Sequence, residues 1–411
     1  MIKAGYKETE LGEIPEEWEC SQVSKIFEVI TGTTPPTRDK KYWAKGNIEW
    51  LTPTDLSKMN NGILISSGER KITELALAET PLKLIPKESI LISTRAPVGY
   101  IAINLQKITF NQGCKGLVPR DKDKYSSYFY AYYLTLKVEF LKSLSAGSTF
   151  TELSKEKLEN AIIPVPPFYE QQKIVKILLD TDDLISSLDE LITKKENIKT
   201  GLMQELLTKG IGHTEFKDTE IGRIPKEWKV VKLVEVIKYV KGKKPKKLKL
   251  EYKDKYIPYL STEYLRENKN AKFVDSLKNV ILINEDDLIL LWDGSNAGEI
   301  FLGRPGVLSS TMVRIQLKNN EYNKTFFYYL LKMNENYIKD RTKGTGIPHV
   351  DKVVLNNINI PILSPVEQKK IADILSDIQQ EIEALEQKRE KYKMIKSGLM
   401  QQLLTGKVRV K

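Results

Sequence analysis

Side chains that could hold a metal ion or move a proton are few in this sequence and show no catalytic spacing. Its two cysteines, Cys20 and Cys114, and its two histidines, His213 and His349, form no CxxC or HxxxH pair, so we expect no zinc site. Two histidines also leave little general-base chemistry. No GxxxxGK(S/T) phosphate loop occurs, and residues 344–346 form a GxG without a third glycine. We therefore expect no metal and no other cofactor.

Two segments imitate catalytic motifs. Residues 165–168, VPPF, resemble the (D/N)-P-P-(Y/F) motif of amino-methyltransferases, but they lack the Asp or Asn that accepts a hydrogen bond from the target amine. Asp351 with Glu-Gln-Lys at 367–369 resembles a nuclease D…ExK set, but a second copy of that segment, at 170–172, has no lysine. We expect no catalysis by this chain, and a self-contained methyltransferase or nuclease is the weaker alternative.

Composition narrows the class of partner. The 411 residues predict two or more domains, and 41% hydrophobic residues are enough to bury their cores. A formal net charge of +11 favours a polyanion, nucleic acid before a membrane surface, although a solvated Lys-rich surface has the same composition. No apolar run reaches the roughly 18 residues of a membrane span. The first residues lack the apolar segment of a signal peptide, and two lone cysteines fit a reducing compartment, so we expect a cytoplasmic protein.

The sequence contains an internal duplication. TELGEIPEEW at 9–18 returns as TEIGRIPKEW at 219–228, with seven of ten positions identical. KTGLMQELLT at 199–208 returns as KSGLMQQLLT at 396–405, with eight of ten identical, and EQQKI at 170–174 returns as EQKKI at 367–371. The matched segments keep the same order in both halves, so the chain consists of two related halves.

Each half reads as a mixed α/β globule followed by one long helix. Apolar runs at 89–93 and 287–291 predict buried strands. Ser364-Pro-Val-Glu367 predicts a capping box at the start of the second long helix, and Glu170 holds the corresponding position in the first.

Both long helices carry apolar residues three and four apart, which predicts a coiled-coil seam between them. An amphipathic helix on its own globule is the alternative, but 38 residues span about 57 Å, more than one such globule. The predicted seam positions are Ile174, Ile177, Leu184, Leu188, Leu191, Ile198 and Leu202 in the first helix, and Ile371, Ile374, Ile378, Ile382, Leu385, Tyr392, Ile395 and Leu399 in the second.

These motifs together resemble the specificity subunit of a type I restriction–modification system. The repeated openings LGEIPEEW and IGRIPKEW, the helix starts IPVPPFYEQQKI and IPILSPVEQKKI, and the helix ends GLMQELLTKG and GLMQQLLTGK are typical of that family. STRAPVGY at 93–100 and FNQGCKGLVP at 110–119 resemble common segments of its recognition domains. WDGSNAG at 292–298 replaces the TRAPVG type in the second half, which suggests that the two halves read different half-sites.

The resemblance implies an α/β (α+β) fold with two similar mixed α/β DNA-recognition domains, separated by two long antiparallel coiled-coil helices in a pseudo-twofold repeat. The expected segments are recognition domain 1 at 1–165, the first helix at 166–212, recognition domain 2 at 213–362 and the second helix at 363–411. The implied partners are double-stranded DNA, two methyltransferase subunits and restriction translocase subunits, with no membrane contact. The alternatives are a related multisubunit methyltransferase or type II-like system without a translocase, and a coiled-coil scaffold without DNA binding.

Residue types indicate which loops would touch DNA. Arg pairs with guanine, Asn and Gln pair with adenine, and Asp accepts from cytosine, although Asn, Asp and Ser also make ordinary turn contacts. The loops at 31–35 and 241–245 are related copies, and their polar or cationic tips suit phosphate or base contact or, for the lysines, a solvated loop. Residues 147–149 and 344–346 are a further pair that suits phosphate or a plain connection. The candidate DNA-binding residues are Thr33, Thr34, Arg95, Asn111, Gln112, Lys115, Lys243, Lys244, Lys246, Asp293, Ser295, Asn296, Ser309 and Ser310.

Overall fold

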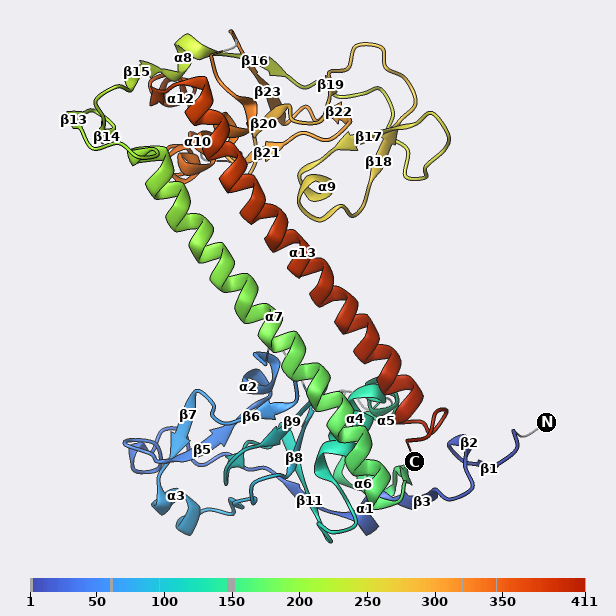
Figure 1. Cartoon of the computed structure of the whole chain (residues 1–411). Coiled ribbons are helices and arrows are strands. Elements are labelled where there is room, and N and C mark those ends of the chain that lie inside the picture. Colours follow the sequence, from blue (N-terminus) through green and yellow to red (C-terminus); the bar gives the residue numbers. More distant parts are fainter. Residues whose placement is uncertain are drawn as a thin grey trace. The chain divides into compact units, whose positions relative to one another are not determined.

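The computed structural model describes residues 3–59, 62–95, 97–145, 152–319, 321–344 and 346–410. Contacts divide the chain into two compact units: unit 1 is Met1–Glu190 with Glu386–Lys411, and unit 2 is Leu191–Leu385. The two long helices are α7 (Phe168–Lys209) and α13 (Pro365–Leu403) (Figure 1). Each of them has one part in unit 1 and the other part in unit 2.

Unit 1 contains the first globular half. Its strands are β1 (Tyr6–Thr9), β2 (Gly12–Pro15), β3 (Glu19–Gln22), β4 (Phe27–Thr31), β5 (Ile48–Leu51), β6 (Leu64–Ile65), β7 (Arg70–Ile72), β8 (Ile90–Thr94), β9 (Val98–Asn104), β10 (Thr109–Phe110), β11 (Cys114–Pro119) and β12 (Ile162–Val165). Its shorter helices are α1 (Val23–Ile26), η1 (Lys40–Tyr42), α2 (Pro53–Ser57), α3 (Glu74–Glu79), α4 (Ser127–Leu136), α5 (Val138–Ser145) and α6 (Lys155–Asn160).

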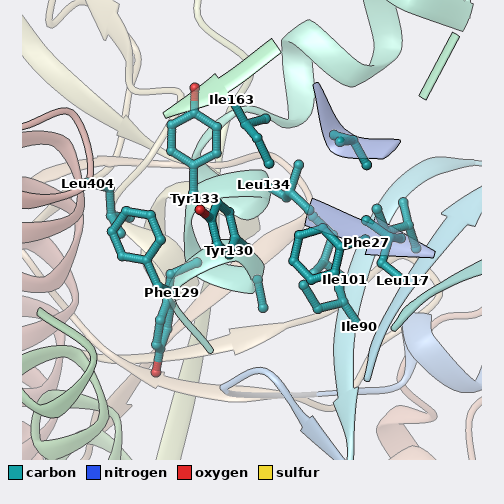
Figure 2. Packing of buried hydrophobic residues seen from close by; sticks show 14 of the residues in the cluster. Phe27, Ile90, Ile101, Leu117, Phe129, Tyr130, Tyr133, Leu134, Ile163 and Leu404 are labelled. Atoms are coloured by element: carbon teal, nitrogen blue, oxygen red, sulfur yellow. The ribbon is translucent and has the colours of Figure 1, made fainter. Parts of the chain in front are cut away.

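The main sheet of unit 1 has the strand order β4-β11-β8-β9-β6, and a smaller sheet has the order β10-β5-β7. The predicted buried strand at 89–93 is confirmed as β8, every residue of which is buried. Helix α4 packs on this sheet, where the rings of Phe27 and Tyr130 meet edge to face with centroids 5.2 Å apart. Figure 2 shows this core, in which aromatic residues of α4 meet aliphatic residues of the sheet.

Unit 2 repeats this plan in outline, with two four-stranded sheets in place of a five-stranded and a three-stranded one. Its strands are β13 (Phe216–Thr219), β14 (Gly222–Pro225), β15 (Lys229–Lys232), β16 (Ile237–Lys241), β17 (Ile257–Leu260), β18 (Lys272–Val274), β19 (Leu282–Ile283), β20 (Leu288–Leu291), β21 (Ile300–Leu302), β22 (Gly306–Leu308), β23 (Met312–Leu317) and β24 (Asn359–Ile362). Its shorter helices are α8 (Leu233–Val236), α9 (Thr262–Glu267), α10 (Lys324–Met333), α11 (Glu335–Lys339) and α12 (Lys352–Asn356). The sheets have the orders β16-β23-β20-β21 and β18-β17-β22-β19. Strand β20 confirms the predicted strand at 287–291.

The segments of α7 and α13 run antiparallel within each unit. In unit 1, Asp182 binds Lys396 at 2.5 Å and Asp189 binds Arg389 at 2.9 Å, so residue numbers rise on one helix as they fall on the other. In unit 2, Lys199 Nζ donates to Gln379 Oε1 at 2.5 Å. The duplicated sequences therefore place related polar pairs, Asp182 with Lys396 and Gln379 with Lys199, at corresponding points of the helix contact.

The helix seam differs in part from the predicted stripe. Ile174 and Leu188 are buried as predicted, but Leu178 and Ile185 are buried where the stripe named Ile177 and Leu184. Likewise Ile192 is buried, Leu191 is 39% exposed and Ile198 is 42% exposed, while in α13 Leu375 is buried and Ile374 is 39% exposed. Apolar residues stand side by side at 177–178, 184–185 and 191–192, so spacing alone could not choose between them.

Two glutamates in the first turns of α7 and α13 bind the repeated tryptophans. Ser364 Oγ accepts from Glu367 N at 3.2 Å, as the predicted capping box requires. A capping box also requires the Glu367 carboxylate to accept from the backbone N–H of Ser364, and this part of the prediction is wrong. The carboxylate accepts instead from Trp228 Nε1 at 3.2 Å. Glu170 accepts in the same way from Trp18 Nε1 at 2.9 Å. The motifs that open each half and begin each helix therefore meet in one contact.

Candidate nucleic-acid interface

The strand registers align the candidate loops of the two units residue by residue. In unit 1, Lys115 of β11 lies opposite Thr31 of β4 and Ile92 of β8. In unit 2, Val313 of β23 lies opposite Lys241 of β16 and Leu290 of β20. Because Thr31 and Lys241 are related copies, Lys115 corresponds to Val313. Counting along the strands then pairs Arg95 with Asp293, Asn111 with Ser309 and Gln112 with Ser310.

In each unit a glycine lets two loops approach each other closely. In unit 1 these are the loop after β4 and the loop before β11, and in unit 2 they are the loop after β16 and the loop before β23. Gly32 donates its N–H to Cys114 O at 3.3 Å, and a Cβ atom at this glycine would lie 2.0 Å from Asn111 O. Gly242 donates to Met312 O at 2.9 Å, and a Cβ atom there would lie 1.9 Å from Ser309 O. Any side chain would force the loops apart, so these glycines explain the G in both TGTTP and KGKKP.

Arg95 and Glu152 stand together at the end of β8 in unit 1. Arg95 Nη1 lies 3.9 Å from Glu152 Oε2, and both side chains are about 40% exposed. The backbone fixes this meeting, because Leu153 N donates to Thr94 O at 2.9 Å and brings the segment after the helices back to β8. The pair therefore presents a donor-rich guanidinium and an acceptor side by side to solvent.

Lys115 lies beneath this pair. Its side chain is buried, and its Nζ donates to Thr94 Oγ1 at 3.4 Å. Burial lowers the pKa of Lys115, the nearby Glu152 carboxylate opposes that effect, and Arg95 adds to it. A buried ammonium near two charged groups influences the electrostatics of the site without reaching its surface.

The loop residues of unit 1 bind one another. Thr34 Oγ1 donates to Gln112 Oε1 and so joins the loop after β4 to the loop before β11. Asn111 Oδ1 accepts from Gly113 N at 3.0 Å, an Asx turn that fits the turn reading of this residue. Gln112 is exposed, whereas Thr33, Thr34 and Asn111 are partly exposed. The structure therefore brings Thr34, Gln112 and Asn111 to one edge of the sheet.

The corresponding edge of unit 2 carries different charges. Asp293 Oδ2 binds Lys241 Nζ at 2.6 Å, and that ammonium also lies 5.8 Å from the centre of the Trp292 ring. Val350 N donates to Trp292 O at 2.9 Å, which corresponds to the contact of Leu153 with Thr94. His349, which precedes Val350, therefore occupies the position of Glu152, and it is exposed.

The remaining candidates of unit 2 differ in exposure. Ser309 is buried and Ser310 is partly exposed, and both bind the Tyr259 hydroxyl, at 3.0 Å through Ser309 Oγ and at 3.2 Å through Ser310 N. Ser295 and Asn296 are exposed in a turn that Ala297 N closes on Gly294 O at 3.0 Å. The candidate lysines Lys243, Lys244 and Lys246 are all exposed in the loop that follows β16.

Comparison with known proteins identifies the family. A family model described as the type I restriction modification DNA specificity domain matches residues 15–199 and 225–393. The chain belongs to this family. It is 30% identical to the MjaIX specificity subunit of Methanocaldococcus jannaschii over 429 residues, which cover 98% of this chain and 96% of that relative. It is 48% identical to the MjaVIII specificity subunit of the same organism over 190 residues, which span 45% of that relative.

A solved structure shows the same fold as this specificity-family chain. The S subunit of the type I restriction–modification system from M. genitalium superposes with a TM-score of 0.61 at 18% identity, covering 94% of this chain and 96% of that one. This likeness confirms the predicted fold of two similar mixed α/β domains with two long helices, and the family model confirms the family resemblance.

Sequence reasoning missed several groups that the structure of this specificity-family chain adds to the site. Glu152, His349 and Tyr259 were outside the candidate set, and Lys241 was included only as part of its loop. Glu152 and His349 are 197 residues apart, the offset of the helix motifs. That offset could have identified Glu152 and His349 as related positions. The segment at 147–149, which suited phosphate or a plain connection, lies outside the described residues, as does Thr345 of its copy.

The residues that imitated catalytic motifs have structural contacts. Asp351 caps α12 by accepting from Val353 N at 2.8 Å and binds Lys343 at 2.7 Å, while Glu367 binds Trp228. Within the described part of the chain, no group of three or more His, Cys, Asp or Glu side chains is arranged to hold a metal ion. Among the same residues, no helix is both long and apolar enough to cross a membrane.

Proposed function

We propose that this chain reads a two-part DNA target for a type I restriction–modification enzyme, with unit 1 on one half-site and unit 2 on the other. One observation carries the proposal: two loops are held together in the same way in both units, yet they bear different side chains. Arg95 with Glu152 in unit 1 corresponds to Asp293 with His349 in unit 2. A shared frame with exchanged hydrogen-bonding groups is what reading two different half-sites requires.

In this proposal the exposed candidates contact bases or phosphates, and the buried ones support them. Arg95, Gln112, Asp293 and Asn296 belong to the first group, because their side chains reach solvent at the loop edge. Lys115 and Ser309 belong to the second, because both are buried. The exposed lysines after Gly242 contact phosphates, which adds affinity without sequence information.

We further propose that the chain itself performs no catalysis and that it binds two methyltransferase subunits and restriction translocase subunits. Each unit exposes large apolar side chains on its segments of the long helices, and contiguous apolar patches often mark interaction sites. These side chains are Leu191, Ile198, Ile374, Met394 and Ile395.

Methylome sequencing of cells with and without this gene tests the proposal. We expect a two-part methylated motif that disappears when the gene is deleted, and an unchanged methylome would overturn the proposed function. The same strains separate the alternatives, since loss of restriction of unmodified phage DNA would show that translocase subunits join the complex. Methyl transfer by the purified chain without partners would contradict the proposed absence of catalysis.

A further inference from the structure

Trp50 and Tyr259 occupy the same structural position in the two units. Trp50 of β5 lies opposite Thr109 of β10 in a parallel pair, and Tyr259 of β17 lies opposite Val307 of β22 in the corresponding parallel pair. Both are buried, with 3% and 8% of their surface exposed. In each unit this aromatic residue therefore lies on the strand that pairs with the one leading into the loop before β11 or β23.

Each aromatic residue uses its one polar group to hold a candidate reading loop. Trp50 Nε1 donates to Thr33 O at 3.0 Å, in the loop after β4. Tyr259 OH donates to Ser309 Oγ at 3.0 Å and accepts from Ser310 N at 3.2 Å, in the loop before β23. The two units thus use one position to hold different loops, and in both the contact reaches residues of the candidate site.

The surroundings of Trp50 make it a rigid support. Its ring meets Trp43 edge to face with centroids 5.0 Å apart, and Arg70 lies 3.7 Å from the Trp43 ring centre. Trp43 Nε1 donates to Pro36 O at 3.0 Å, so the two tryptophans hold the loop at 33–36 by carbonyls near both of its ends. Packed rings lock the direction of the N–H groups and hence the position of Thr33 and Thr34.

We propose that Trp50 and Tyr259 are positioning residues that set sequence discrimination, Trp50 for the half-site of unit 1 and Tyr259 for that of unit 2. Neither residue needs to touch DNA, because each acts through the loop it holds. The inference rests on the proposed function. It adds that discrimination in each half-site depends on one buried hydrogen-bonding group beneath the reading loops.

Tyr259→Phe tests the inference with little risk to folding, since it removes only the hydroxyl. The variant chain, assembled with its methyltransferase subunits, is assayed for binding to the cognate duplex and to duplexes with single mismatches in either half-site. We expect discrimination in one half-site to fall by at least about three- to tenfold, the range that loss of one hydrogen bond gives, because the hydroxyl makes two; the other half-site should be unchanged. Trp50→Phe removes the indole N–H and is expected to reduce discrimination in the other half-site, the one assigned to unit 1.

Tyr322→Phe is the matched control in unit 2. The Tyr322 hydroxyl is likewise buried and donates to Pro361 O at 3.0 Å, but it lies at β24 and not at the reading loops. We expect a similar change in thermal stability and unchanged discrimination. Equal loss in both half-sites, or unchanged discrimination in Tyr259→Phe and Trp50→Phe, would overturn the inference. Failure of the wild-type complex to recognise any two-part motif would instead overturn the proposed function.

Discussion

Arg95 and Asp293 hold one structural position in the two units and carry opposite charges. A guanidinium donates to O6 and N7 of guanine, whereas a carboxylate accepts from N4 of cytosine. Their neighbours differ as well, since Glu152 lies 3.9 Å from Arg95 and Lys241 binds Asp293 at 2.6 Å. Each of these two proposed reading groups therefore has a neighbour of opposite charge, and removing one group should affect one half-site.

Arg95→Ala should weaken recognition of one half-site only, by about 1–3 kcal/mol, the value of a lost bidentate base contact. Binding of the assembled complex to duplexes altered in either half-site measures the effect. Arg120→Ala is the control, because Arg120 follows the far end of β11 and its Nε donates to Ser24 O at 2.9 Å. Equal weakening of both half-sites by Arg95→Ala would mark Arg95 as a structural or phosphate-binding residue.

Replacing Lys243, Lys244 and Lys246 together by alanine should mainly reduce the salt dependence of DNA binding. Each lost phosphate contact lowers the slope of log K against log salt by about 0.9, so the slope should fall by up to about three. Titrations of the complex at several salt concentrations give this slope. The control variant replaces three exposed lysines outside that loop, Lys217 of β13, Lys226 after β14 and Lys229 of β15, and should leave the slope unchanged. An unchanged slope in the Lys243, Lys244 and Lys246 variant would show that these lysines lie in a solvated loop and do not contact phosphates.

At the scale of elements, the start of each long helix is joined to its globule by a buried glutamine. Gln171 Oε1 accepts from Ser126 N at 2.9 Å, and its Nε2 donates to Lys124 O at 3.0 Å and Pro166 O at 2.8 Å. Gln368 makes the corresponding contacts with Asn323 N, Glu321 O and Leu363 O. These backbone contacts explain why a glutamine follows the glutamate at the start of both helices.

Gln171→Ala should therefore lower the free energy of unfolding by about 2–4 kcal/mol, because it leaves one buried and two partly buried backbone groups without their side-chain partner. Denaturant unfolding of the purified chain measures the change. Gln172→Ala is the matched control on the same helix, since Gln172 is exposed and should change the stability by less than about 0.5 kcal/mol. Equal effects of the two substitutions would show that the hydrogen bonds of Gln171 do not hold α7 to the globule.

The sequence predicted where strands and helices lie better than it predicted which side chains those elements bury or bind. Duplicated motifs and apolar periodicity identified β8, β20 and the start of α13, because these signals are local. The burial of Leu178 in place of Ile177 was not predictable, since both neighbours are apolar and only packing selects one. The contact of Glu170 with Trp18 was also missed, because it joins residues far apart in sequence and the capping rule offered Glu170 a nearer partner.

Across the whole molecule, different chain segments complete the same contact in the two units. In unit 1, Arg409 from the end of the chain donates through Nε to Glu170 Oε1 at 2.7 Å. In unit 2, His213 and Ile211, which follow α7, bind Glu367 Oε1 at 2.8 Å and 3.0 Å. The segment that follows each long helix thus packs against the first turn of the other helix within its own unit.

This packing changes where a spacer insertion must be placed. Sequence alone suggests the junction at 209–212, but Ile211 N binds Glu367 there and a Cβ atom at Gly210 would lie 2.4 Å from Glu367 Oε1. An insertion at the junction should therefore disturb unit 2 and weaken one half-site. The helices pass from one unit to the other between Glu190 and Leu191 and between Leu385 and Glu386, and an insertion there should act on the spacing alone.

We predict that four residues inserted after Glu190 and four after Leu385, made together, lengthen the non-specific gap by about two base pairs and keep both half-site sequences. Four helical residues rise about 6 Å, near two base-pair steps of about 3.4 Å, and they turn the helix by about 400°, close to one full turn. Two residues in each helix turn it by about 200° and should abolish methylation. The methylated motif of each insertion strain is the measurement. A gap that stays the same in a viable strain would show that partner subunits or DNA bending, and not α7 and α13, set the distance between half-sites.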